Sequence, residues 1–258
     1  MKLENKVAIV TGAAGGIGRA IAIRLAKEGA ALSVVDIDLE TLNKVADEIQ
    51  GMRCKGIAVK ANVTSSQEVK QMVKTTLDEF GTIDILVNVA GGSGSKRGNF
   101  HEIPEEVWGS VINLNLKGTL VCCHEVIEHM IQKRRGKIIS ISSVSGMIGS
   151  SIGMAPYSAA KAGVIGFTKA LAKELGPYGI NVNCISPGPI ATQLMLRHGE
   201  EIAKKLESFT YLKRLGKPEE VANVVIFLAS DEASYVTGQN YAVCGGRSLG
   251  WSENAGCS

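Results

Sequence analysis

The stretch Thr11-Gly12-Ala13-Ala14-Gly15-Gly16-Ile17-Gly18 decides the fold of this 258-residue chain. An apolar run at residues 6–11 leads into it, and Ile17, Ile21 and Leu25 follow it at helical spacing. Glycines at such a strand-to-helix turn let the backbone approach a ligand, and the helix N-terminus presents free N–H groups. The stretch therefore predicts a site for the pyrophosphate of a dinucleotide at the first turn of the fold.

Short apolar runs alternate with helical patterns along the rest of the chain. The predicted strands are residues 6–11, 31–35, 56–59, 83–87, 137–142, 181–185 and 240–243, and the predicted helices after the first are residues 39–50, 65–80, 104–135, 157–175 and 218–229. The strands are apolar throughout, as expected when helices cover both faces of a parallel sheet. The pattern predicts an α/β fold, a single-domain Rossmann-type doubly wound parallel sheet of about seven strands flanked by helices.

No internal repeat, low-complexity tract or proline-rich linker divides the chain, so we expect one domain over residues 1–258. The cofactor half is expected at about residues 1–150. Substrate loops and a lid are expected at about residues 92–99, 144–154 and 190–216, because ligands of such sheets bind at the carboxyl ends of the strands.

Asp36 ends the second predicted strand and is the candidate for cofactor choice. A carboxylate there can accept hydrogen bonds from the hydroxyls of the adenosine ribose and repels the 2′-phosphate of NADP. No basic residue stands at positions 13, 14 or 37 to compensate. The position favours NAD.

Composition and charge exclude several classes of protein. The chain is 45% hydrophobic and only 5% aromatic, and its net charge of +3 is too small to indicate nucleic-acid binding. It has no apolar stretch long enough for a transmembrane helix and no signal-peptide core, so we expect no membrane partner. Six cysteines without a CxxC pair indicate free thiols and a cytoplasmic protein, and four histidines without ligand spacing indicate no metal.

The glycine spacing TGxxxGxG, together with Tyr157-Ser158-Ala159-Ala160-Lys161, resembles the short-chain dehydrogenase/reductase family. The resemblance covers nearly the whole chain. It includes, in order, Asn88-Val89-Ala90-Gly91, Asn115, Ser143 and Pro187-Gly188. The chain departs from the family pattern at Asn62, where Asp is usual, at Val89, where Asn is usual, and at Cys244, where Asp is usual.

The Tyr157 and Lys161 pair predicts its own chemistry. The two residues are four apart on a predicted helix and so share one face. A tyrosine has an ordinary pKa of about 10, and a neighbouring ammonium together with a positive nicotinamide ring favours the phenolate. Tyr157 can then remove the hydroxyl proton of an alcohol as hydride passes to the nicotinamide, and in reverse protonate the forming alkoxide.

The resemblance implies roles for further residues. Lys161 also binds the nicotinamide ribose, and Ser143 binds the substrate oxygen, with Ser142 as the competing candidate because strand neighbours point to opposite faces. Asn115 holds a water linked to Lys161, unless it is simply a satisfied buried amide. The full cofactor-binding set is Gly12, Gly16, Ile17, Gly18, Asp36, Asn62, Val63, Asn88, Ala90, Tyr157, Lys161, Pro187, Gly188, Ile190 and Thr192.

Substrate identity stays open at this stage. Lys96, Arg97 or Arg197 could bind an anionic group of the substrate, although a solvated loop charge explains each of them as well. The resemblance implies a homotetramer, or a homodimer, paired through the helices that begin near Pro104 and Tyr157.

The function that we expect is hydride transfer between NAD(H) and a secondary alcohol or hydroxy acid/ketone pair. The alternative is a 3-oxoacyl-thioester reductase acting on acyl carrier protein or coenzyme A substrates. A sugar epimerase or dehydratase is disfavoured, because the chain lacks the longer C-terminal substrate domain that such enzymes normally need. A dinucleotide-sensing regulator without turnover is disfavoured too, because it does not need Ser143, Tyr157, Lys161 and Asn115 together.

Overall fold

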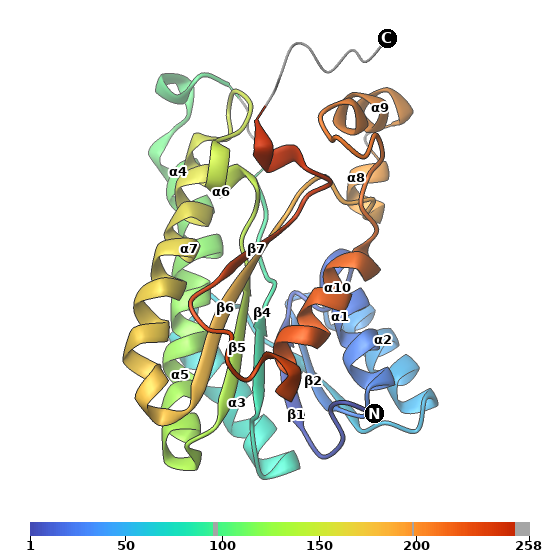
Figure 1. Ribbon diagram of the computed structural model, residues 1–258, viewed down its shortest axis with the longest axis vertical. Helices are drawn as coiled ribbons and strands as arrows, with labels where there is room; N and C mark the ends of the chain where they lie inside the picture. Colours follow the sequence, from blue (N-terminus) through green and yellow to red (C-terminus); the bar gives the residue numbers. More distant parts are fainter. Residues whose placement is uncertain (95–97, 198, 251–258) are drawn as a thin grey trace.

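The computed structural model describes residues 1–94, 98–197 and 199–250. In these ranges seven parallel strands form one sheet in the order β3-β2-β1-β4-β5-β6-β7 (Figure 1). The strands are β1 (Val7–Thr11), β2 (Ala31–Asp36), β3 (Gly56–Lys60), β4 (Ile85–Asn88), β5 (Gly136–Ile141), β6 (Ile180–Pro187) and β7 (Asn240–Val243). The predicted doubly wound parallel sheet is confirmed, and its order reverses between β1 and β4, where such folds bind ligands.

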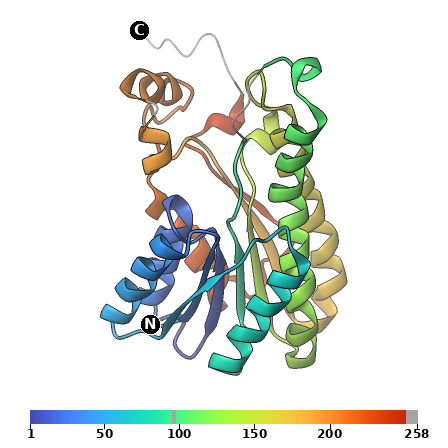
Figure 2. The same ribbon diagram turned by 180° about the vertical axis from the view of Figure 1, so that it is seen from behind.

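Helices cover both faces of this sheet. They are α1 (Gly16–Lys27), α2 (Leu39–Gly51), α3 (Ser66–Phe80), α4 (Glu105–Ile112), α5 (Gly118–Lys133), α6 (Ser145–Ile148), α7 (Ala155–Leu175), α8 (Gln193–Leu196), α9 (Glu200–Ser208) and α10 (Pro218–Ala229). The helices α1, α2 and α10 form one layer, and α3, α5 and α7 form the other (Figures 1 and 2). The helices α8 and α9 stand beyond the carboxyl ends of the strands.

Two buried clusters, one on each face, explain why the strands are apolar throughout. Neighbouring residues of one strand belong to different clusters: Ile9 packs under α3 and α5, whereas Val10 packs under α1 and α10. Leu86 and Val87 divide in the same way on β4. Each side chain of a central strand therefore has a hydrophobic layer to enter, and no polar face remains.

The helix predicted over residues 104–135 is interrupted. A π-helical segment, Asn113–Lys117, separates α4 from α5 and carries Asn115 at its middle. A π turn inserts one extra residue per turn and is found mainly at functional sites. The apolar side chains before and after this segment keep the 3.6-residue spacing of an ordinary α-helix, so the sequence did not indicate the π-helical turn. By contrast, the ends of α3 are as the sequence predicted, because Ser65 caps its start and Gly81, at φ +72°, ends it.

Asp84 joins three elements at the amino end of the sheet. Its buried carboxylate accepts hydrogen bonds from the Val7 N–H at 3.0 Å, from Arg135 at 2.7 Å and from Lys133 at 3.2 Å. Burial by itself raises the pKa of Asp84, but these three donors outweigh it and hold the pKa below its ordinary value. The ionised form therefore fixes the start of β1 against the end of α5 and the start of β5.

We predict that Asp84→Asn lowers the free energy of unfolding by about 3 kcal/mol, because removing one partner leaves the other charges uncompensated. Because the pKa of Asp84 is lower in the folded chain than in the unfolded chain, its stabilisation is complete above the ordinary carboxyl pKa of about 3.9 and is lost as the pH falls below it. Urea unfolding between pH 3 and 7 measures both effects. Asp78→Asn, which removes an exposed carboxylate paired with Lys74, is the control and should change the free energy by less than about 0.5 kcal/mol. Equal unfolding midpoints for Asp84→Asn and the parent chain would contradict the prediction.

Candidate active site

A cavity of about 1340 Å³ opens at the carboxyl ends of the strands, at the point where the strand order reverses. Its walls come from the segments after the strands β1 to β6 and from the helices α8 and α9. It brings together most of the predicted site residues: Gly12, Gly16, Ile17, Gly18, Asp36, Asn62, Val63, Ala90, Ser143, Tyr157, Lys161, Pro187, Gly188, Ile190 and Thr192.

The glycine turn after β1 is tight because side chains are absent from it. Gly12 has a φ of +66°, and a Cβ added there would lie 2.8 Å from the Ala90 nitrogen. A Cβ added at Gly18 would overlap the Gly12 carbonyl. Gly15, which caps the N-terminus of α1, has nothing within 4 Å of its own added Cβ and lines the cavity. The turn thus folds against itself on one side and leaves its backbone open to a ligand on the other.

Asp36 lies at the end of β2 and contributes its carboxylate to the cavity wall. One oxygen accepts a hydrogen bond from the Ala14 N–H at 3.1 Å, and the other accepts from Ile37 at 2.7 Å and Asp38 at 3.2 Å. The carboxylate is therefore fixed in place by the backbone, and its bond to Ala14 ties it to the glycine turn.

Asn62 and Val63 follow β3 on the same side of the cavity. The side-chain amide oxygen of Asn62 accepts hydrogen bonds from the Thr64 N–H at 3.0 Å and from the Thr64 hydroxyl at 2.9 Å. The side chain is therefore engaged in a local turn. Val63 is buried against α5, where a Cβ at Gly118 would lie 2.7 Å from its Cγ2.

Asn88, a predicted cofactor contact, has its side chain engaged by the protein itself. Its side chain is buried behind the cavity and donates hydrogen bonds to Ser140 at 3.2 Å and to Cys123 at 3.3 Å, and it does not line the wall. Thr11, which the sequence reasoning did not single out, holds the same turn instead. Its hydroxyl accepts hydrogen bonds from the N–H groups of Val89 at 3.0 Å and Ala90 at 3.2 Å. A threonine at the end of a buried strand gave no separate signal.

Ser143, Tyr157 and Lys161 lie together on one wall of the cavity. Ser143 follows β5, and its side chain lies close enough to the Tyr157 hydroxyl to lower the pKa of that tyrosine. The Lys161 ammonium lies 5.7 Å from the centre of the Tyr157 ring and donates to the Ile141 carbonyl at 2.7 Å. Ser142 instead donates to the Lys161 carbonyl at 2.8 Å. Ser142 therefore contacts the backbone of Lys161, whereas Ser143 is the serine whose side chain lies near the Tyr157 hydroxyl.

Burial shifts the pKa values of the tyrosine and the lysine in opposite directions. It raises the pKa of Tyr157, and the hydrogen bond with Ser143 offsets only part of that rise. It lowers the pKa of the fully buried Lys161 to about 8. The expected lowering of the Tyr157 pKa by Lys161 is thus not met by the protein alone, because desolvation disfavours the charged form of each group.

Asn115 lies directly behind this wall, in the π-helical segment. Its amide nitrogen donates to the Gly92 carbonyl at 2.7 Å and to the Val111 carbonyl at 2.9 Å, and its oxygen accepts from the Gly92 N–H at 3.1 Å. A Cβ at Gly91 would lie 2.6 Å from this oxygen and 3.2 Å from the Lys161 nitrogen. The side chain therefore anchors the loop after β4 and leaves no room for a side chain at position 91.

The segment after β6 closes the cavity opposite the glycine turn. Thr192 caps α8 by accepting a hydrogen bond from the Met195 N–H at 3.2 Å, and its methyl group lies 3.2 Å from the position of a Cβ at Gly16. Ile190 pairs with Gly216 in an isolated β-bridge. The predicted lid region thus contains two short helices that are anchored at both ends.

Of the three basic residues considered for an anionic substrate group, the structure describes one. Lys96 and Arg97 lie outside the described residues, and Arg197 is exposed at the cavity edge. Arg247, which the sequence analysis did not select, also lines the cavity. It follows two glycines after β7, where no periodicity marks it as inward-facing.

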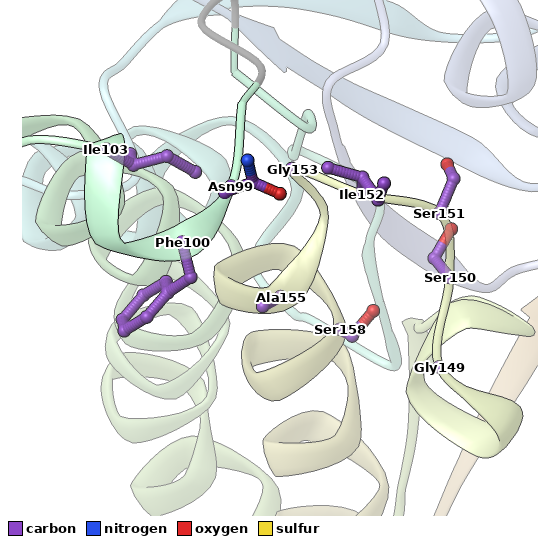
Figure 3. Close-up of a pocket in the computed structure, with 10 residues that line it drawn as sticks. All are labelled: Asn99, Phe100, Ile103, Gly149, Ser150, Ser151, Ile152, Gly153, Ala155 and Ser158. Carbon is purple, nitrogen blue, oxygen red and sulfur yellow. The ribbon is translucent and has the colours of Figure 1, made fainter.

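A smaller cavity of about 510 Å³ adjoins the large one. Figure 3 shows Asn99, Phe100 and Ile103 on one side and the segment from Gly149 to Ser158 on the other. Ser150 and Ser151 line both cavities. The Ser158 hydroxyl is buried there without a hydrogen-bond partner among the residues that the structure describes.

Three further features of the described ranges bear on other kinds of site. Within them no group of three or more histidine, cysteine or acidic side chains could hold a metal ion. The cysteines described there, five of the six in the chain, are free thiols. None of the helices that the structure describes is both long and apolar enough to span a membrane.

Comparisons with known proteins agree with this site. A family model described as enoyl-(acyl carrier protein) reductase matches residues 12–248. The chain is 42% identical to (2S)-[(R)-hydroxy(phenyl)methyl]succinyl-CoA dehydrogenase subunit BbsD of Thauera aromatica, covering 96% of this chain and 99% of that protein. It is 43% identical to 3-oxoacyl-[acyl-carrier-protein] reductase FabG of Thermotoga maritima, with 95% and 99% covered.

Solved structures show the same likeness. Levodione reductase superposes with a TM-score of 0.90 at 34% identity, covering 96% of this chain and all of that one. The protein gox2181 superposes with a TM-score of 0.92 at 34% identity, covering 96% of this chain and 98% of that one. The glycine turn, the Tyr157–Lys161 pair and these likenesses over nearly the full length show that the chain belongs to the short-chain dehydrogenase/reductase family of oxidoreductases.

Proposed function

We propose that the protein transfers a hydride between NAD(H) and a secondary alcohol or hydroxy acid/ketone pair. One observation carries the proposal: Tyr157, with Ser143 and Lys161 beside it, lies in the same cavity as the glycine turn and Asp36. A proton donor and a dinucleotide-sized cradle in one cavity are what this reaction requires.

The cavity fits a nicotinamide dinucleotide. Gly12, Gly16, Ile17 and Gly18 would hold the pyrophosphate at the N-terminus of α1, and Asp36 would bind the adenosine ribose. The adenine would lie by Asn62 and Val63, and the nicotinamide end by Ala90, Tyr157, Lys161, Pro187, Gly188, Ile190 and Thr192. When bound, the nicotinamide supplies the site that gives or takes the hydride.

The protein's own residues manage the proton. Because burial raises the pKa of Tyr157, its hydroxyl is protonated at neutral pH and is ready to protonate the oxygen of a ketone as that oxygen gains charge. Ser143 stabilises the same oxygen through a hydrogen bond. Lys161 compensates the phenolate that remains. Asn115 positions the Gly91–Gly92 loop against Lys161 and would hold the water linked to Lys161.

A second candidate is reduction of a 3-oxoacyl thioester by the same residues. The names of two relatives, a hydroxy(phenyl)methylsuccinyl-CoA dehydrogenase subunit and a 3-oxoacyl-[acyl-carrier-protein] reductase, favour it, because both name thioester substrates. Acetoacetyl-CoA compared with methyl acetoacetate, at equal cofactor concentration, separates the candidates. A kcat/KM at least about tenfold higher for the thioester, which corresponds to about 1.4 kcal/mol, selects the second one.

We also propose that residues 1–258 act as one cytoplasmic domain that assembles as a homotetramer, or as a homodimer. Free thiols support the location. Exposed apolar side chains near α6 and α7, including Phe100 at 58% and Ile152 at 74% exposure, support the assembly, because grouped apolar surface marks an interface.

For the cofactor, we predict that NADH binds at least about tenfold more tightly than NADPH, since Asp36 repels a 2′-phosphate. Titration of NADH and NADPH fluorescence measures the two dissociation constants. Asp36→Asn should narrow the ratio, whereas the control Asp38→Asn should not, because the Asp38 carboxylate binds Thr41 within α2. Equal or tighter binding of NADPH by the parent chain would show that Asp36 does not select the cofactor.

For the mechanism, we predict that Tyr157→Phe lowers kcat for ketone reduction by about 10²- to 10⁴-fold, the usual contribution of general acid catalysis. The NADH dissociation constant should change little, because the ring remains in place. Nicotinamide absorbance follows turnover across a panel of ketones and hydroxy acids. Tyr178→Phe removes a hydroxyl from a tyrosine beyond the end of α7 and is the control. Undiminished turnover by Tyr157→Phe rejects the mechanism.

For the loop after β4, we predict that Gly91→Ala lowers kcat about tenfold or more, because its methyl group pushes on Asn115 and Lys161. Gly92→Ala is the matched change at the next residue, where an added Cβ has nothing within 4 Å. Steady-state kinetics and melting temperature compare the two variants. If both variants lose the same activity, the contact of Gly91 with Asn115 and Lys161 is not what limits the site.

A further inference from the structure

Arg247 occupies an unusual position in the large cavity. It begins a short 3-10 turn, Arg247–Leu249, after β7, and this turn lies beyond the carboxyl ends of the strands between α6 and α9 (Figure 1). Leu206 from α9 and the following Phe209 line the same cavity. The side chain thus reaches the cavity from the lid side.

The guanidinium of Arg247 has no polar partner among the residues that the structure describes. Its carbon lies 4.9 Å from the centre of the Phe209 ring, over the ring face. Its Nη1 atom is fully buried and has no hydrogen-bond partner among the described residues, and none of the ion pairs in those ranges includes Arg247. A buried donor without an acceptor is costly, and more so when it carries charge.

The charged groups around the cavity leave this guanidinium unsatisfied. Asp36, the one carboxylate in the described part of the wall, accepts three backbone N–H bonds at the end of β2. Lys161 donates to Ile141, and Arg197 is exposed. Burial lowers the pKa of Arg247, consistent with a cation that has lost water and gained no anion.

The strand order separates Arg247 from the glycine turn. Strands β4, β5 and β6 lie between β1 and β7, so the strand that precedes Arg247 is four positions along the sheet from the one that leads into the proposed pyrophosphate site. The backbone just before it, at Cys244, touches the segment after β6, because a Cβ at Gly188 would lie 2.7 Å from the Cys244 Cα. The group that meets Arg247 is therefore expected to belong to the substrate.

We propose that Arg247 binds the carboxylate of an oxo acid or hydroxy acid substrate and makes the enzyme selective for such acids over neutral ketones and alcohols. A planar guanidinium pairs with a planar carboxylate through two parallel hydrogen bonds, and a single cation matches a single negative charge. The ring of Phe209 holds the guanidinium plane in place. This substrate class rests on the proposed hydride transfer, whereas the binding of the carboxylate itself does not require turnover.

Steady-state reduction of three oxo acids and their methyl esters tests the selectivity. The acids 3-oxobutanoate, 4-oxopentanoate and 5-oxohexanoate vary the distance between the carbonyl and the carboxylate. We expect the parent enzyme to prefer at least one acid over its ester by about tenfold or more in kcat/KM. Arg247→Gln should lower kcat/KM for that acid by about 10- to 100-fold, as expected for the loss of a hydrogen bond between charged groups. It should change kcat/KM for the methyl ester by less than about threefold. Arg247→Lys should retain part of the preference.

Two further variants separate this site from a general effect of charge. Arg53→Gln removes the same charge from an exposed arginine after α2, remote from the cavity, and should leave the ratio of acid to ester unchanged. Arg197→Gln tests the exposed arginine at the cavity edge. If the preference depends on Arg197 and not on Arg247, or if the parent enzyme prefers no acid, the proposal is wrong.

Calorimetric titration with the same three acids, in the presence of NADH or NADPH, separates this proposal from the proposed function. Binding by the parent chain that Arg247→Gln loses supports the carboxylate site even if no ketone is reduced. Reduction of neutral ketones without binding of any acid overturns the carboxylate site and leaves the hydride transfer standing. Binding of cofactor and a cooperative melting transition show that each variant is folded.

Discussion

The close approach of two backbones at the carboxyl ends of β1 and β4 is the constraint on which the rest of the site depends. Gly12 lies so near Ala90 and Gly18 that a Cβ at either glycine meets main-chain atoms. The Thr11 hydroxyl ties the two turns together through the N–H groups of Val89 and Ala90. Since these contacts involve backbone, no change of rotamer can relieve an added side chain. The first helix can begin where it does, with its N–H groups facing the cavity, only because this packing is possible.

Close packing also fixes the wall of the cavity that carries Tyr157 and Lys161. Gly91 continues the β4 turn and packs against Asn115 and Lys161, and the π-helical widening of the α4–α5 helix places Asn115 at that point. Lys161 is in turn buried and bonded to the end of β5. Burial raises the pKa of Tyr157 and lowers that of Lys161 to about 8, so at neutral pH the tyrosine is protonated and the lysine still carries most of its charge. The buried ammonium can therefore compensate the phenolate that forms when Tyr157 gives its proton to the substrate oxygen.

The sequence predicted correctly those features that depend on residues close together in the chain. Apolar strands, capped helices and glycine spacing identified the seven-stranded sheet, the ends of α3 and the place of the first turn. It failed where the cause is a neighbour distant in the chain. The side-chain partners of Asn88 are such neighbours, because Ser140 and Cys123 accept hydrogen bonds from its amide behind the wall. The π turn was concealed because apolar spacing on both sides of it remains compatible with an ordinary helix.

The sequence by itself determined the parallel sheet, the glycine turn and the helix face shared by Tyr157 and Lys161, because each depends on residue type and on spacing within one segment. Only the tertiary structure decided which of the two serines meets Tyr157 and which residues stand behind the cavity wall. It also decided that Arg247 is the partly buried cation of the lid side, whereas Arg197 is exposed. Those properties arise from packing between segments far apart in the chain. Contacts of that kind produce no periodic pattern in a single sequence, so the sequence alone does not predict them.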